Sequence, residues 1–244
     1  MILFCLIAIL VYALTYNSEN KLYREIGLLA LAFAFSLKLY PVIFGYFLLV
    51  DKRFKEAIRC AIYGVLMLII PSFFFGGPAC FVQVFKNITS FSSGGKAVNS
   101  VSVLAGYTGI PTSVWTVAAY LWCFICALCF AVSPFVHKQR WKTYMIGVTL
   151  ILLVPSLTSL YTWAFLIIPI LFLANGERLR KKDWFFFLIM SALFMFTVLR
   201  FNGYLTINSF LLYPFTMVLS VTAVIDTVAA SLKALRERKA NLVD

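Results

Sequence analysis

The residue best placed to do chemistry is Lys38, which lies inside the apolar run at residues 26–50. An ionisable side chain within a bilayer costs about 3 kcal/mol or more, so it generally has a functional reason to be there. Tyr40 and Pro41 follow it, and a proline in a membrane helix removes a backbone hydrogen bond and favours a kink. Such a lysine can hold an anionic ligand. The alternative is a structural lysine that reaches the interface or pairs with a carboxylate.

The composition is that of an integral membrane protein. Hydrophobic residues make up 63% of the chain and charged residues 12%, whereas about a quarter of a soluble domain is charged. Most of the six cysteines lie in apolar runs, so no disulfide framework is expected. The first fifteen residues lack a basic leader, which favours a membrane span over a cleaved signal peptide.

Apolar segments follow one another along the chain and predict an all-α, polytopic membrane protein with about eight transmembrane segments. The sequence predicts a single transmembrane domain over residues 1–244, with an outside loop at 76–110 and a tail at 231–244. The predicted spans are 2–16, 26–50, 60–75, 111–132, 144–154, 161–173, 184–199 and 209–230.

Basic residues alternate between the connections and predict the orientation. Fifteen of the 21 lysines and arginines lie in the loops 51–59, 133–143 and 175–183 and in the tail, and five lie in the alternate connections. Because basic loops stay in the cytoplasm, both termini are predicted there, in a multi-pass plasma-membrane protein. The positive charge then faces anionic lipid headgroups and is not the mark of nucleic-acid binding. His137, in a basic loop, is predicted to be solvated.

A second candidate site lies in the stretch 144–174, which reads as two short segments that meet at a polar junction. Ser156, Ser159 and Tyr161 stand at this junction. Polar, non-helical backbone at membrane depth is tolerated where it faces protein or a water-filled cavity. The alternative is an ordinary helical hairpin in which serine and threonine cap the neighbouring backbone.

The long outside loop carries a third polar group. Its first part is rich in phenylalanine and predicts an interfacial helix, and its second part is small, polar and glycine-rich and includes Asn99 and Ser100. Loops of this length are usually functional or disordered. Gly95-Lys96 is not a phosphate-binding P-loop, because Ser90 and Ala97 break the required pattern.

Three cysteines recur at every third position of one predicted span: Cys123, Cys126 and Cys129. Thiolates can bind a metal, but no fourth ligand accompanies them and hydrocarbon disfavours the thiolate. We therefore interpret them as small packing residues, and we expect no metal and no cofactor.

Three of these motifs occur in the order in which one known family carries them: Lys38-Leu39-Tyr40-Pro41, Asn99-Ser100-Val101-Ser102, and the residues 155–161. Together they resemble glycosyltransferase family 87 (the DUF2029 group), which is similar in fold to the GT-C glycosyltransferases. The resemblance implies a membrane hexosyltransferase, such as a mannosyltransferase. Its donor would be a sugar on polyprenyl phosphate, and its acceptor a glycan or lipid at the outer face.

The resemblance also implies roles for the candidate residues. Lys38, Tyr40 and Arg200 would hold the lipid phosphate, whose charge needs fixed cations. The polar residues of the loop and the junction would contact the substrate: Asn99, Ser100, Ser156, Ser159 and Tyr161. A carboxylate base would deprotonate the acceptor hydroxyl.

The carboxylate is the weakest point of the resemblance. GT-C enzymes carry this acid on their first outside loop, and only Glu19 and Glu25 of the nine carboxylates fall on predicted outside connections. The family is also longer. We therefore expect these 244 residues to correspond to its C-terminal part, with a catalytic N-terminal half encoded separately as a partner. The alternatives are a degenerate relative, or Glu25 or Glu19 as the base.

Two other functional classes remain open. A polyprenyl-linked glycan flippase or a small-solute transporter would also need a charge within the membrane and broken helices, and an inverted repeat would favour it. A non-catalytic membrane subunit is the other alternative.

Overall fold

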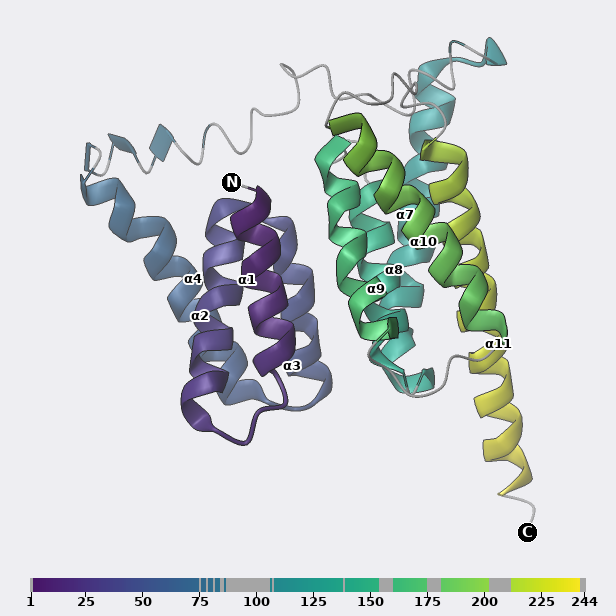
Figure 1. Cartoon of the computed structure of the whole chain (residues 1–244), viewed down its shortest axis with the longest axis horizontal. Coiled ribbons are helices and arrows are strands. Elements are labelled where there is room, and N and C mark those ends of the chain that lie inside the picture. Colours follow the sequence, from purple (N-terminus) through teal and green to yellow (C-terminus); the bar gives the residue numbers. More distant parts are fainter. Residues whose placement is uncertain are drawn as a thin grey trace. The chain divides into compact units, whose positions relative to one another are not determined.

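All regular secondary structure in the part of the chain that the structure describes is helical. The computed structural model describes residues 2–74, 76–77, 79–80, 82–83, 86, 106, 108–137, 139–153, 160–174, 181–201 and 212–241. These residues contain α-helices and short 3-10 helices and no strand, which confirms the all-α prediction. The chain forms two compact units, Met1–Gly95 (unit 1) and Lys96–Asp244 (unit 2) (Figure 1).

Unit 1 contains a short bundle in which neighbouring elements are connected by tight turns. Its elements are α1 (Ile2–Thr15), α2 (Lys21–Leu37), the 3-10 helix η1 (Tyr40–Gly45), α3 (Tyr46–Val50) and α4 (Phe54–Phe74). The buried residues of α1 recur at helical spacing, as Cys5, Ile9 and Tyr12 show, and the buried Tyr16 directly after the helix extends the stripe. This stripe packs against α2, and Gly27 of α2 allows the two helices to approach closely.

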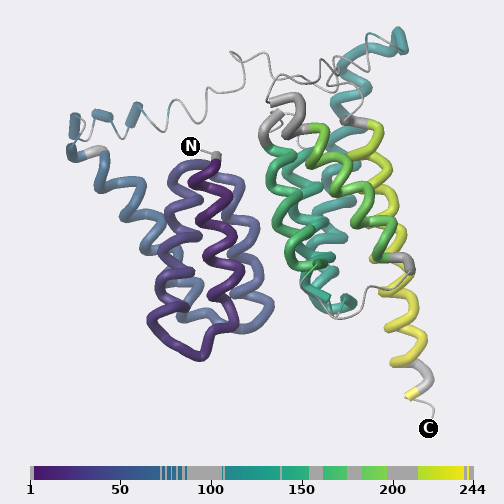
Figure 2. Tube along the Cα trace, in the orientation of Figure 1, coloured from purple at the N-terminus to yellow at the C-terminus, as the bar shows by residue number. Residues whose placement is uncertain are grey.

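The predicted span 26–50 is not one helix. The first part, α2, ends at Leu37, and η1 and α3 then run back beside α1 (Figure 2). Two hydrogen bonds establish the direction of the returning segment: the Tyr12 hydroxyl donates to the Phe44 carbonyl at 3.2 Å, and the Tyr16 hydroxyl donates to the Phe47 carbonyl at 2.9 Å. The prediction of a continuous span is therefore wrong. The run is a hairpin whose bend lies at Lys38.

This hairpin also changes the predicted arrangement of the connections. Arg24 pairs with Glu56 at 3.4 Å, and Arg59 pairs with Glu25. The connection at 17–25 and the loop at 51–59 therefore lie at the same end of unit 1, although the sequence predicted them on opposite faces of the membrane. The N-terminus lies at the other end of unit 1 (Figure 1), which disagrees with its predicted placement beside loop 51–59.

The other helices whose bounds the structure describes belong to unit 2. They are α7 (Thr112–Val136), α8 (Arg140–Leu153), the 3-10 helix η2 (Leu160–Leu166), α9 (Ile167–Ala174), α10 (Lys181–Phe201) and α11 (Leu212–Ala240). The predicted tail at 231–244 is thus helical as far as Ala240. At about 1.5 Å per residue, α11 is about 44 Å long and exceeds the roughly 30 Å of a hydrocarbon core.

The stretch 144–174 has the predicted two-segment form. The ring of Tyr144, near the start of α8, stacks on Phe172, near the end of α9, with centroids 4.8 Å apart. The two segments are therefore antiparallel, as in a hairpin. The side chains of Cys123, Cys126 and Cys129 are all buried on one face of α7, which agrees with their interpretation as packing residues.

Among the residues that the structure describes, two helical stretches are long and apolar enough to cross a membrane by length and composition, Thr112–Val136 and Pro214–Arg238. Shorter apolar helices occur at Leu3–Thr15, Tyr40–Val50, Thr162–Ala174 and Asp183–Phe196. Large apolar side chains, such as Phe124 and Leu128 of α7, are exposed along these helices. Outward-facing apolar residues are what a lipid environment requires.

Candidate functional site

Lys38 lies at the bend between α2 and η1. It is the C-cap of α2, with an extended backbone (φ −152°, ψ 136°), and its N–H donates to the Ala34 carbonyl at 3.0 Å. Pro41 stands in the first turn of η1, where a missing N–H costs nothing because no intrahelical acceptor precedes it. Pro41 therefore starts a helix here instead of kinking one.

The bend places a half-buried cation at a helix end, not in the middle of a membrane helix. Along α2, Lys38 is 17 residues from Lys21, which corresponds to about 25 Å. The Cys5 thiol contacts the Ala34 carbonyl at 3.8 Å, so the first turns of α1 lie beside this end of α2. Tyr40, the next candidate, is 8% exposed and packs within unit 1.

The two candidate bases lie at the opposite end of unit 1. Glu25 accepts hydrogen bonds from Arg59 and, at 3.1 Å, from the Tyr63 hydroxyl. It is 13 residues from Lys38 along one helix, or about 20 Å. Glu19 is exposed in the connection before α2. The structure therefore does not bring either carboxylate to Lys38.

Two of the other predicted site residues lie in helices of unit 2. Tyr161 belongs to η2 and Arg200 to α10, with the backbone alone described. Asn99, Ser100, Ser156 and Ser159 lie outside the described residues.

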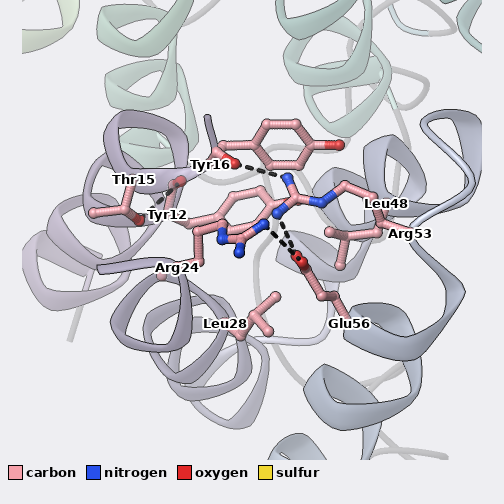
Figure 3. A pocket seen from close by; sticks show the side chains of 9 residues that line it. Tyr12, Thr15, Tyr16, Arg24, Leu28, Leu48, Arg53 and Glu56 are labelled. Atoms are coloured by element: carbon pink, nitrogen blue, oxygen red, sulfur yellow. Dashed lines mark hydrogen bonds and ion pairs between the residues drawn. The ribbon is translucent and has the colours of Figure 1, made fainter. Parts of the chain in front are cut away.

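A polar cluster at the end of unit 1 opposite Lys38 was not predicted from the sequence. The Arg53 guanidinium donates to the Tyr16 carbonyl at 2.7 Å, pairs with Glu56 at 2.5 Å, and lies over the Tyr16 ring (Figure 3). The Tyr16 hydroxyl oxygen also lies 2.7 Å from an Asp51 carboxylate oxygen, so this carboxylate and the Phe47 carbonyl share the single hydroxyl proton. Burial lowers the pKa of Arg53, but the hydrogen bond and the charge of Glu56 outweigh it and hold that pKa above its ordinary value.

The space between these side chains is filled. No water-sized volume remains among Tyr12, Tyr16, Arg24 and Arg53, so the cluster is a packed joint between helices. The sequence does contain a signal for this cluster. Arg24 and Glu25 on one segment match Glu56 and Arg59 on the other, a positive charge facing a negative one in each pair. It becomes readable only once the two segments are known to lie side by side.

A second buried polar group lies in unit 2. Lys142, with its side chain 5% exposed, pairs with Asp226 and lies over the rings of Trp141 and Phe186. The His137 ring accepts or donates a hydrogen bond with Thr227 at 3.2 Å, and its side chain is 7% exposed. The prediction of a solvated His137 is therefore wrong, and Lys142 belongs to the interior and not to a solvated basic loop.

The comparisons with known proteins agree with the resemblance in the sequence. The model of glycosyltransferase family 87 matches residues 2–156, a region that includes α1 to α8 and the bend at Lys38. Neither the curated proteins nor the solved structures gave a match. The match covers more than half of the chain, so the protein belongs to glycosyltransferase family 87.

Proposed function

We propose that the chain binds a polyprenyl-phosphate sugar at Lys38 and takes part in transferring a mannose-like hexose to a glycan or lipid acceptor at the outer face of the plasma membrane. Family membership makes it a membrane glycosyltransferase. The observation that carries the assignment of the donor is the helix bend, which presents a single half-buried ammonium group at the end of α2.

The physics of a helix end supports this role. The last carbonyl groups of a helix carry partial negative charge and favour a cation beside them, and Lys38 stands at such a helix end. A protonated lysine binds phosphate as a point charge. In a transfer reaction it would stabilise the phosphate as that group leaves the sugar.

The charge distribution of unit 1 supports an outer-face donor. The junction of α3 and α4, which carries the basic residues Lys52, Arg53 and Lys55, lies at the end of the unit opposite the junction of α2 and η1, where Lys38 stands (Figure 1). If that basic end is cytoplasmic, as the positive-inside rule predicts, Lys38 points toward the outer leaflet. Tyr40 would then pack beside the phosphate, and Arg200, Asn99, Ser100, Ser156, Ser159 and Tyr161 remain the proposed further contacts.

Binding of polyprenyl phosphate to the purified chain in lipid nanodiscs tests the proposal. We expect Lys38→Met to fold and to lose at least about tenfold in affinity, since a charge-assisted hydrogen bond is worth about 1.5–3 kcal/mol. Lys38→Arg should retain part of the binding because it keeps the charge but changes the geometry. Lys55→Met, which removes an exposed cation from the far end of unit 1, is the control. Equal binding by Lys38→Met and the native chain would make Lys38 a structural residue.

A further inference from the structure

We propose that the end of unit 1 opposite Lys38 holds a second binding site, specific for a phosphate-bearing anionic group. The site is a pocket of about 270 Å³ lined by Lys21, Arg24, Glu25 and Arg59, which we call the basic pocket. A water molecule occupies about 30 Å³ of liquid, so the space admits a phosphate group together with some of its water.

The lining has an excess of positive charge. Three cations face one carboxylate, and that carboxylate is already held by Arg59 and by the Tyr63 hydroxyl. Lys21 is exposed and has no carboxylate partner among the described residues. An anion entering the pocket would therefore not need to displace an existing ion pair of Lys21.

Arg24 lines the basic pocket and is also anchored in the neighbouring polar cluster. Its guanidinium reaches Glu56 at 3.4 Å, and its packing against Tyr12 and Leu28 leaves no room for water on that side (Figure 3). Its Nε atom is buried and has no hydrogen-bond partner within the described part of the chain. Because this atom is not accessible, Arg24 contributes to the pocket through its charge and through the part of its side chain that is exposed, 32% of it.

The N-terminal end of α2 adds to the positive potential of the pocket. The helix begins at Lys21, its first turn contains no acidic residue, and only the Leu22 N–H is capped, by the Asn20 side chain at 2.9 Å. The positive end of the helix dipole therefore faces the pocket region together with the three cationic side chains.

The surroundings favour a lipid as the source of the phosphate. Ile26 is next to Glu25 on α2, and Ile58 and Ile62 flank Arg59 on α4, and these side chains are 41%, 61% and 51% exposed. Acyl chains can lie along these apolar residues while the headgroup occupies the pocket. A free phosphate has the same anionic chemistry but would gain nothing from them.

Two probes distinguish these sources. The full chain is purified in mixed micelles containing phosphatidylcholine and phosphatidylglycerol, and the phospholipids that it retains are counted by native mass spectrometry. In parallel, inorganic phosphate is titrated while the thermal midpoint is followed, since a ligand of the folded state raises it. Selective retention of phosphatidylglycerol indicates a lipid headgroup, and a phosphate-dependent rise that Lys21→Gln removes indicates a free phosphate. Either result supports an anion site.

The variants test the pocket itself. Lys21→Gln and Arg59→Gln should each lower the preference for phosphatidylglycerol about five-fold, as expected for one cation near an anionic surface. Lys55→Gln removes an exposed cation from the same end of the unit but outside the pocket, and should leave the preference unchanged.

Because Arg59 also pairs with Glu25, Arg59→Lys is added to keep the charge, and it should bind like the native chain. Lys21→Gln breaks no such ion pair, so a loss of binding in this variant reports directly on the pocket. Unchanged binding in Lys21→Gln, or an equal loss in Lys55→Gln, would overturn the proposal in favour of diffuse surface charge. The readout is independent of Lys38, which lies at the other end of α2.

Discussion

At the scale of single residues, burial separates the charged groups that stabilise the fold from those that can meet a ligand. Lys142 and Asp226 form a pair whose side chains are 5% and 17% exposed, whereas Lys233 and Glu237 form one whose side chains are 80% and 66% exposed. Removing one partner of a buried pair leaves an uncompensated charge. An exposed pair contributes little, because water and salt screen it.

We expect Asp226→Ala to destabilise the chain by about 3 kcal/mol, because it leaves the Lys142 ammonium buried without its carboxylate. Thermal unfolding in detergent provides the measurement. Lys142→Met combined with Asp226→Leu should recover most of the loss, since both charges are then absent. Glu237→Gln, which removes one charge of the exposed pair, is the control. It should unfold at the same temperature as the native chain. A similar loss in Glu237→Gln would show that the buried pair has no special role.

At the scale of elements, close contacts between helices determine the shape of unit 1. A Cβ atom added to Gly27 would lie 2.2 Å from Thr15 Oγ1, so only glycine fits where α1 and α2 approach. A Cβ atom added to Gly45 would meet nothing closer than Leu31 at 3.8 Å, which is ordinary contact. The same substitution should therefore have opposite effects at these two glycines.

Gly27→Ala should lower the free energy of unfolding by about 1–3 kcal/mol through overpacking. Gly45→Ala should be neutral or stabilise by up to about 1 kcal/mol, because alanine reduces the freedom of the unfolded chain. Chemical denaturation of the two variants in parallel compares them directly. Thr15→Ala in the Gly27→Ala background removes the clashing oxygen and should restore part of the loss. Equal stability of the two single variants would contradict the close packing of α1 on α2.

The hairpin at Lys38 predicts a cross-link that a continuous helix forbids. Leu31 and Gly45 are neighbours in the hairpin, whereas 14 residues of unbroken helix would separate them by about 21 Å. In a background without native cysteines, Leu31→Cys with Gly45→Cys should be joined by a short bis-maleimide, detected by mass spectrometry. The pair Leu31→Cys with Lys55→Cys is the control for non-specific reaction. Absence of the first cross-link would restore the single span.

At the scale of the whole molecule, the distribution of basic residues predicts how unit 1 is oriented in the membrane. Unit 1 gathers Lys21, Arg24, Lys52, Arg53 and Lys55 at one end. The hairpin thus brings together basic residues that the simple alternation of spans had divided between two faces. The positive-inside rule therefore predicts that this end, together with the connection that contains Glu19, faces the cytoplasm.

Labelling of cysteines with a membrane-impermeant maleimide tests this orientation. Glu19→Cys and Lys55→Cys should both be protected in intact cells and react after permeabilisation, because the ion pair Arg24–Glu56 and the hydrogen bond from Arg53 to Tyr16 bring their two connections to the basic end of unit 1. Leu235→Cys on the basic end of α11 provides a further position that we expect to be protected. Reaction of Glu19→Cys from outside, with Lys55→Cys protected, would support the alternation predicted from sequence and contradict the hairpin.

The sequence by itself determined the class of the protein and the position of most helices. Hydropathy and charge are local properties, and they identify apolar segments whatever their partners are. The starts and ends of α1, α7 and α10 therefore agree with the predicted spans to within a few residues. The separation of α8 from α9 was also predictable, since basic loops flank both ends of that stretch. Lys38 and Pro41 marked the place where the chain bends, although not that it reverses there.

The tertiary structure alone decided what the apolar run at 26–50 becomes. Its hydropathy fits one long helix as well as a hairpin, because apolar content carries no direction. The choice depends on contacts with α1, where the hydroxyls of Tyr12 and Tyr16 bind carbonyls of the returning segment. The same reversal brings Arg24 to Glu56 and Arg59 to Glu25, and so creates the basic pocket. These pairs are more than 30 residues apart in sequence, and their charges could be matched only after the fold had placed their helices side by side.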